Sequence, residues 1–171
     1  MTDNGSAFPD HGLLDPDPEL VRPVTMTVDS GLPRDRAAHL VKITQLLYTF
    51  WHTGDVRWLH AAVDPAFVDN TLPQGRPQGV EGVVQASKAF REAVPDLTCE
   101  LADVLIAGDK VAVRLVFRGH FSGLFNDVQG DGRAIEFIAF DIQHVGEQLI
   151  VEDWHLEDNL AFLTQAGLLG V

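Results

Sequence analysis

The stretch IEFIAFDIQHVGEQLIVEDWHLEDNL, residues 135–160, decides the expected fold. It contains two apolar-rich runs, residues 135–145 and 149–156, separated by Gly146-Glu147-Gln148. The first run is rich in β-branched and aromatic residues, and a glycine-containing break of three residues is typical of a β-hairpin. The stretch therefore predicts two paired strands that lead into a last helix.

Three polar residues in this hairpin make it the expected functional site. Asp153 and His155 are two residues apart on one strand, so their side chains point to the same face. With a three-residue loop, Val145 opposes Leu149. Asp141 then opposes Asp153, and all three polar groups share one face. With a two-residue turn the register slips by one residue, and Asp141 faces the other side of the sheet. The predicted cluster depends on the turn.

Composition narrows the class of protein. The chain has 171 residues, which suits one domain with a real core. Twelve Lys and Arg against 25 Asp and Glu give a net charge of −13, which argues against nucleic acid or an anionic membrane as a partner. Cys99 is the only cysteine, so neither a disulfide framework nor a cysteine-based metal site is expected.

The chain shows no sequence signal for a membrane or for export. Its first ten residues, MTDNGSAFPD, contain neither a positive n-region nor an apolar h-region. Its apolar runs are shorter than the roughly 18–20 residues of a membrane span. We therefore expect a soluble cytoplasmic protein.

Residues 1–33 are rich in Pro, Asp and Gly and have no sustained hydrophobic period, so we expect a mostly flexible acidic N-terminal tail. Within it, the alternating segment VTMTV, residues 24–28, could add an edge strand. The remaining chain, residues 34–171, is expected to form the single folded domain.

The hydrophobic period predicts helices first and strands afterwards. We expect helices over residues 34–51, 56–63, 80–93 and 160–169, and a short extended piece over residues 65–73. Residues 97–108 and 110–123 have a period of two and predict strands that precede the closing hairpin. This order is typical of the α+β class. We expect a strongly curved antiparallel sheet wrapped around helices, which forms a cone with an internal pocket.

Several segments taken together resemble one family. They are LLYTFWHTGDVRWLHAAVDPAFVDNTLPQGRPQGVEGV (residues 46–83), AVPDL (93–97), AGDKVAVRLVFRGHFSGLF (107–125) and the closing hairpin with its helix (135–169). Their order and spacing are similar to the SnoaL-like polyketide cyclases, or ester cyclases, over about residues 34–169. The resemblance implies a nuclear transport factor 2-like α+β cone and a cofactor-free enzyme that is commonly dimeric or tetrameric.

The resemblance also implies a reaction. The namesake members close a ring by intramolecular aldol condensation of a polyketide ester, using a His on the first hairpin strand and an Asp on the second. Here Asp141 stands at the position most like that His, and His155 at the position most like that Asp. Asn70 stands where many members have His, and His120 lies one residue before the usual His, which Phe121 replaces.

Asp141 and His155 are therefore the predicted catalytic pair, because a carboxylate and an imidazole in a dry pocket can share the roles of base and acid. Each also has a structural interpretation: Asp141 could be a carboxylate neutralised by a nearby Arg, and His155 a structural histidine at a strand end. Arg114 could pair with Asp141 or Glu136, or polarise a substrate carbonyl. The predicted substrate-binding residues are Tyr48, Trp51, Asn70, Arg114, His120, Phe137 and Asp153.

We expect neither a metal nor a cofactor. Asp153-x-His155 offers two ligands without a third at a usual spacing, and GVEGV does not follow a strand as a dinucleotide loop would. The expected partners are a small-molecule substrate and further copies of the chain. Ring closure in an apolar, carbonyl-bearing, polyketide-like molecule is the first hypothesis. An epoxide-opening hydrolase or ether-ring cyclase in the same pocket is the second, and a non-catalytic binding or association module the third.

Overall fold

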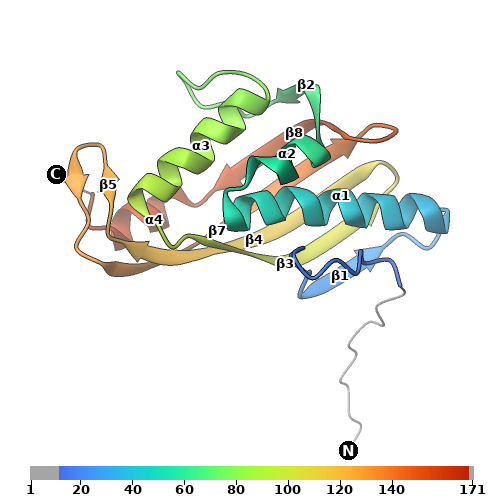
Figure 1. Cartoon of the computed structure of the whole chain (residues 1–171), viewed down its shortest axis with the longest axis horizontal. Helices are drawn as coiled ribbons and strands as arrows, with labels where there is room; N and C mark the ends of the chain where they lie inside the picture. The colour runs from blue at the N-terminus through green and yellow to red at the C-terminus, as the bar shows by residue number, and fades with distance from the viewer. Residues whose placement is uncertain (1–11, 170–171) are drawn as a thin grey trace, which may run out of the picture.

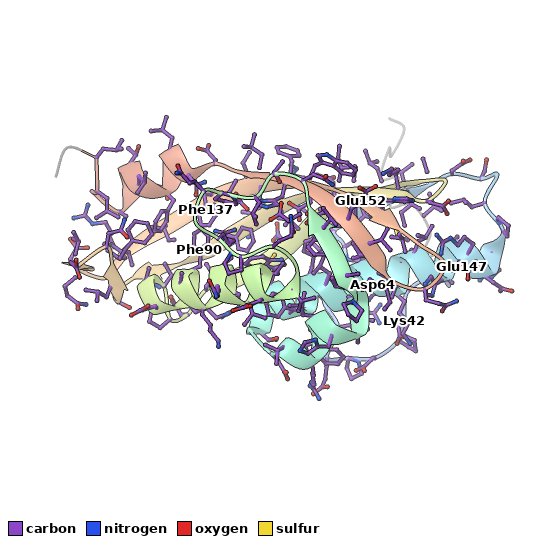
Figure 2. All side chains as sticks on the ribbon, turned by 90° about the horizontal axis from the view of Figure 1, so that it is seen from above. Lys42, Asp64, Phe90, Phe137, Glu147 and Glu152 are labelled. Carbon is purple, nitrogen blue, oxygen red and sulfur yellow. The ribbon has the colours of Figure 1, made fainter. Side chains whose placement is uncertain are left out.

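The computed structural model describes residues 12–169, which contain four helices and a six-stranded main sheet. The helices are α1 (Arg34–Thr53), α2 (Val56–Ala62), α3 (Val80–Ala93) and α4 (Asn159–Gln165). In Figure 1, α1, α2 and α3 lie across one side of the long strands, and Figure 2 shows the same two layers from above. The α+β class is confirmed. Among the described residues, no helix is long and apolar enough to cross a membrane.

The sheet is mixed, whereas the sequence predicted an antiparallel one. Its six strands have the order β1 (Thr25–Val28), β3 (Thr98–Ala107), β4 (Lys110–Phe121), β7 (Arg133–Val145), β8 (Ile150–Glu157), β2 (Val63–Asp69). The four central strands are antiparallel, but β1 is parallel to β3 and β2 is parallel to β8. Both edge strands pair with strands far away in the sequence, and hairpin patterns carry no information on such pairs.

The described part of the N-terminal region, residues 12–33, is packed against the domain, which differs from the mostly flexible tail predicted there. Leu13 and Leu20 are buried in the hydrophobic core, and Asp15 forms an ion pair with Lys42 at 2.9 Å. The edge strand predicted over residues 24–28 is confirmed as β1. Scattered apolar residues in a Pro-rich segment have no period, so the sequence did not predict their burial. Residues 1–11 of the predicted tail lie outside the described residues.

A small hairpin follows the second long strand of the sheet. It pairs β5 (Leu124–Phe125) with β6 (Val128–Gln129). Asn126 and Asp127, between them, have φ values of 45° and 65°. Asn and Asp adopt this left-handed conformation more readily than other non-glycine residues, which is why a two-residue turn forms here.

The register of the closing hairpin places its polar residues on the inner face. Asp141 lies directly opposite His155 and Gln143 opposite Asp153, with a register shift between the pairs of His144 and Val145. The prediction that Asp141 opposes Asp153 is therefore wrong by two residues. Because a shift of two residues preserves the face of every side chain, the predicted shared face is confirmed.

Candidate active site

A pocket lies between the inner face of the sheet and the helices, with an apolar wall and a polar end. It holds about 710 Å³ of empty space, counting the solvent at its mouth. Strands β4, β7 and β8 present alternate side chains to it, because every second residue of a strand faces inward. The polar end consists of Asp69, Arg76, Asp141, Asp153, His155 and Glu157.

The apolar wall is largely aromatic. The rings of Phe90 and Phe137 are stacked with centroids 5.6 Å apart, and those of Phe117 and Phe137 with centroids 5.1 Å apart. Figure 2 shows Phe90 on α3 and Phe137 on the sheet close together. Trp51 meets Phe117 edge-on at 6.0 Å. These rings give the pocket flat apolar surfaces of the kind that favour planar ligands.

Asp141 is a buried carboxyl group held by a tyrosine from α1. Tyr48 Oη donates a hydrogen bond of 2.7 Å to Asp141 Oδ2, and the Gln143 side-chain amide donates to the same hydroxyl. Burial raises the pKa of Asp141 to about 6, although the hydrogen bond from Tyr48 and the charge of His155 act in the opposite direction. Burial and the nearby Asp141 raise the pKa of Tyr48 well above its usual value, so Tyr48 remains a donor.

Asp153 is the second carboxyl group at the polar end. Its Oδ1 atom is buried and has no hydrogen-bond partner within residues 12–169. Burial and the charge of Asp141 raise the pKa of Asp153 to about 7. Asp141 and Asp153 therefore titrate in the neutral range where acid–base catalysts operate.

His155 is held between two carboxylates. Its Nδ1 lies 2.7 Å from Glu157 Oε1, and its Nε2 lies 3.1 Å from Asp69 Oδ2. The hydrogen bond to Glu157 is the main cause that raises the pKa of His155 to about 10, and Asp69 adds to it. The ring is therefore an imidazolium at neutral pH, and both of its N–H groups are engaged. It supplies positive charge to the site but does not accept a proton there.

Three of the predicted substrate-binding residues line the pocket: Trp51, Phe137 and Asp153. Tyr48 does not reach the pocket surface, because it is fully buried behind Asp141. Asn70 is exposed, and its amide donates to Glu152 Oε2 at 3.3 Å, away from the pocket.

Two predicted basic residues lie on other surfaces. Arg114 is on the outer face of the sheet, where its Nη2 lies 2.6 Å from Asp103 Oδ2, so it pairs with neither Asp141 nor Glu136. His120 is exposed, and its Nδ1 lies 2.6 Å from Asp96 Oδ2. The alternation of β4 explains both positions, because Arg114 and His120 are even-numbered residues, whereas the odd-numbered Val113, Leu115, Phe117 and Phe121 are buried on the inner face.

Sequence reasoning missed Asp69, Arg76 and Glu157. A signal for Glu157 was present, because Asp153, His155 and Glu157 alternate along one strand and share its inner face. Asp69 could have been inferred in the same way, as it lies two residues after the buried Phe67. Arg76 lies in a loop and had no periodic signal.

The structure also supplies the third potential metal ligand that the sequence lacked. Ligand atoms of Asp69, Asp153 and His155 all lie within 4.8 Å of one another, so these groups could hold a metal ion. Such an ion would have to displace the proton that His155 shares with Asp69.

Comparisons with known proteins agree with this architecture. The model of the family described as SnoaL-like polyketide cyclase matches residues 41–166. A Bacillus cereus structure with the proposed role of polyketide cyclase is 42% identical, with a TM-score of 0.81, over 88% of this chain and 95% of that one. IdmH of Streptomyces antibioticus, which has the same proposed role, is 30% identical, with a TM-score of 0.66, over 73% of this chain and 96% of that one.

TsrD of Streptomyces laurentii is 25% identical, with a TM-score of 0.69, over 77% of this chain and 97% of that one. A search of the curated proteins finds no match. The family model spans most of the chain and the Bacillus cereus structure exceeds 30% identity, so the chain belongs to the SnoaL-like polyketide cyclase family.

Proposed function

We propose that this protein is a cofactor-independent acid–base catalyst that closes a ring in an apolar, carbonyl-bearing, polyketide-like molecule by an intramolecular aldol-type reaction. Family membership supports a cyclase-type role. One observation carries the proposed chemistry: two carboxyl groups, with pKa values of about 6 and 7, stand on one face at the end of an apolar pocket. This assignment keeps Asp141 and replaces His155 by Asp153 as the second acid–base group.

We assign Asp141 as the base, because the hydrogen bond from Tyr48 and the charge of His155 favour its ionised form. We assign Asp153 as the acid, because its buried Oδ1 has no hydrogen-bond partner within residues 12–169 to stabilise a charge. Asp141 takes the proton from an acidic C–H next to a carbonyl, and the electron pair forms an enolate. The enolate carbon attacks a second carbonyl carbon of the same molecule. A C–C bond forms, the C=O π bond breaks, and its oxygen takes the proton from Asp153. Proton transfer from Asp141 to Asp153 restores the starting state, so atoms and charge balance.

His155 has an electrostatic role in this scheme. Its positive charge lowers the pKa values of both Asp141 and Asp153 against the effect of burial. Without that charge, burial would keep both carboxyl groups protonated at neutral pH, and the base would be lost.

Product analysis with active-site variants tests the proposal. A panel of planar aromatic keto esters with an acidic α-C–H is incubated with the protein, and mass spectrometry follows a product of unchanged mass. Asp141→Asn and Asp153→Asn should each lower the rate by at least about 100-fold. Asp103→Asn on the outer face is the matched control and should keep the wild-type rate. If both active-site variants also keep it, the assignment is wrong.

The same carboxyl pair favours one alternative reaction. A base that activates water and an acid that protonates an oxygen are also what the opening of an epoxide needs. Hydrolysis adds the mass of water to the product, whereas cyclisation does not. A pocket that binds the ligands of the panel without turnover would instead support a non-catalytic binding module.

A further inference from the structure

Arg76 brings a positive charge to the pocket. It lies in the loop between β2 and α3, is half-buried and lines the pocket. Its charge lowers the pKa of Glu157, so the two groups are near each other. Within residues 12–169, however, its guanidinium has no hydrogen bond and no carboxylate oxygen within 4.0 Å. An arginine among acidic residues usually pairs with one of them, as Arg114 does with Asp103.

The other cation at the polar end has no donor to offer. Both ring nitrogens of His155 are already bonded to carboxylates. The Tyr48 hydroxyl is committed to Asp141 behind the pocket wall. Of the two cations that line the polar end, Arg76 is therefore the one whose N–H donors can bind an oxygen of an incoming ligand.

We propose that Arg76 forms an oxyanion subsite, in which its guanidinium binds the substrate oxygen that becomes negative when the C–H proton is removed. This inference rests on the proposed function and makes it more specific. A planar guanidinium matches two oxygens that lie side by side. The enolate of a 1,3-dicarbonyl presents two such oxygens, so the favoured substrate is a β-dicarbonyl compound with a planar apolar body.

The position of the charge has a catalytic consequence. Removal of the proton turns a neutral carbonyl oxygen into an anion, and a donor that is already in place stabilises that anion more than the ground state. Arg76→Gln should therefore lower kcat by about 10²–10³-fold and change KM much less. Since the side chain makes no hydrogen bond to residues 12–169, the variant should fold normally.

A binding experiment tests the subsite without turnover. 2-Naphthoate carries two charged oxygens on a flat apolar body, and 2-naphthamide is its neutral counterpart. Affinities are measured by calorimetry at pH 6, where naphthoate is ionised and Asp153, with a pKa of about 7, is mostly protonated. We expect the wild type to prefer naphthoate by about tenfold or more, Arg76→Gln to lose that preference, and the control Arg114→Gln to keep it.

The outcomes separate the subsite from the proposed function. If Arg76→Gln keeps the wild-type preference, or if the wild type binds both probes equally or binds neither, the subsite is overturned. If Asp141→Asn and Asp153→Asn remain active while the naphthoate preference depends on Arg76, the acid–base proposal fails and the subsite stands. If both Asp variants are inactive and Arg76→Gln has full activity and full preference, only the subsite fails.

Discussion

At the scale of single residues, Tyr48 favours the ionised form of Asp141. Its hydrogen bond of 2.7 Å lowers the pKa of that buried carboxyl group. Tyr48→Phe removes this bond, so the pKa of Asp141 should rise above about 6. The acidic limb of the profile of kcat/KM against pH should then move to higher pH. A limb that stays in place would show that Tyr48 has only a structural role.

The two carboxyl groups together predict a narrow pH optimum. The base Asp141 must be ionised, so the rate falls below its pKa of about 6. The acid Asp153 must be protonated, so the rate falls again above its pKa of about 7. We expect kcat to follow a bell-shaped curve with its maximum between these values. A rate that continues to rise towards pH 9 would contradict this assignment.

The raised pKa of Asp153 also means that this residue lowers the stability of the folded protein at alkaline pH. The pKa of Asp153 is raised from 3.8 to about 7, so the folded state binds its proton more tightly than the unfolded state does. The stabilisation that this bound proton gives the folded state is fully present below the unfolded pKa of 3.8 and is lost as the pH rises through about 7. Asp153→Asn should therefore raise the free energy of unfolding at pH 8 by about 1–3 kcal/mol and change it little at pH 4.

Urea unfolding at the two pH values measures this difference. Asp103→Asn is the control, because hydrogen bonds from Thr25 and Arg114 lower the pKa of Asp103, whereas the pKa of Asp153 is raised. Asp103→Asn should therefore not raise the free energy of unfolding at pH 8. An Asp153→Asn variant that is less stable than the wild type at pH 8 would show that the buried carboxylate has a favourable partner.

At the scale of elements, the position of the site was predictable from the sequence but its pairing was not. An Asp inside an apolar strand and two polar residues with a period of two on the next strand predicted a shared inner face, and the structure agrees. The true register depends on a four-residue connection and an irregularity near Val145, which no pattern in the hairpin encodes. The period of a strand predicts on which face of the sheet each side chain lies, whereas the length of the turn determines which residue of the next strand lies opposite.

The role of His155 was missed because the sequence does not show its non-local partner. Asp69 comes from β2, which pairs in parallel with β8 although it lies more than 80 residues away. A lone imidazole on a strand resembles a free catalyst, but the same imidazole between Asp69 and Glu157 is a fixed cation. Parallel pairs between distant strands leave no hairpin signal, and therefore this contact required the structure.

His155 on β8 contacts Glu157 on the same strand and Asp69 on β2, so substitution of His155 should lower the stability of the protein. His155→Gln leaves Asp69 and Glu157 without their cation in a mostly buried site, so the free energy of unfolding at pH 7 should fall by about 3 kcal/mol. Because the pKa of His155 is raised to about 10, the stability that its positive charge contributes is fully present below the unfolded pKa of 6.5. It is lost as the pH rises through about 10.

Urea unfolding of His155→Gln beside His120→Gln checks this expectation. His120 also contacts a carboxylate, Asp96, but both side chains are more than half exposed, so the control should change stability little. Equal effects of the two substitutions would mean that the contacts of His155 with Asp69 and Glu157 contribute no more to stability than a surface ion pair does.

At the scale of the whole molecule, the outer face of the sheet carries a band of exposed apolar side chains that nothing else within residues 12–169 covers. Leu105, Ala112, Ile142 and Trp154 form one cross-strand row over β3, β4, β7 and β8. In the next row, Phe140 and Leu156 are neighbours and remain 52% and 74% exposed. Helices α1, α2 and α3 lie on the opposite side of the sheet, as Figures 1 and 2 show. Contiguous apolar surface of this kind is typical of a protein interface.

A second copy of the chain is the partner that we propose for this face. The chain carries a net charge of −13, so two copies repel each other over most of their surfaces. The outer face lessens this repulsion, because many of its exposed side chains are apolar and its charges include ion pairs of Arg114 with Asp103 and of Arg118 with Glu100 and Glu136. Face-to-face packing of two such sheets buries the apolar rows of both copies.

Leu156→Asp tests this arrangement, because it places a charge at the most exposed apolar side chain of the face. In a symmetric dimer the substitution introduces two carboxylates into one interface, and each loses its hydration without gaining a partner. Light scattering after gel filtration should give the mass of two chains or a multiple of it for the wild type and of one chain, 18.7 kDa, for the variant. The matched control is Leu124→Asp, which alters an exposed leucine on the separate β5–β6 hairpin and should leave the wild-type mass unchanged. A wild type with the mass of one chain at tens of micromolar, or a Leu156→Asp variant with the wild-type mass, would contradict pairing through this face.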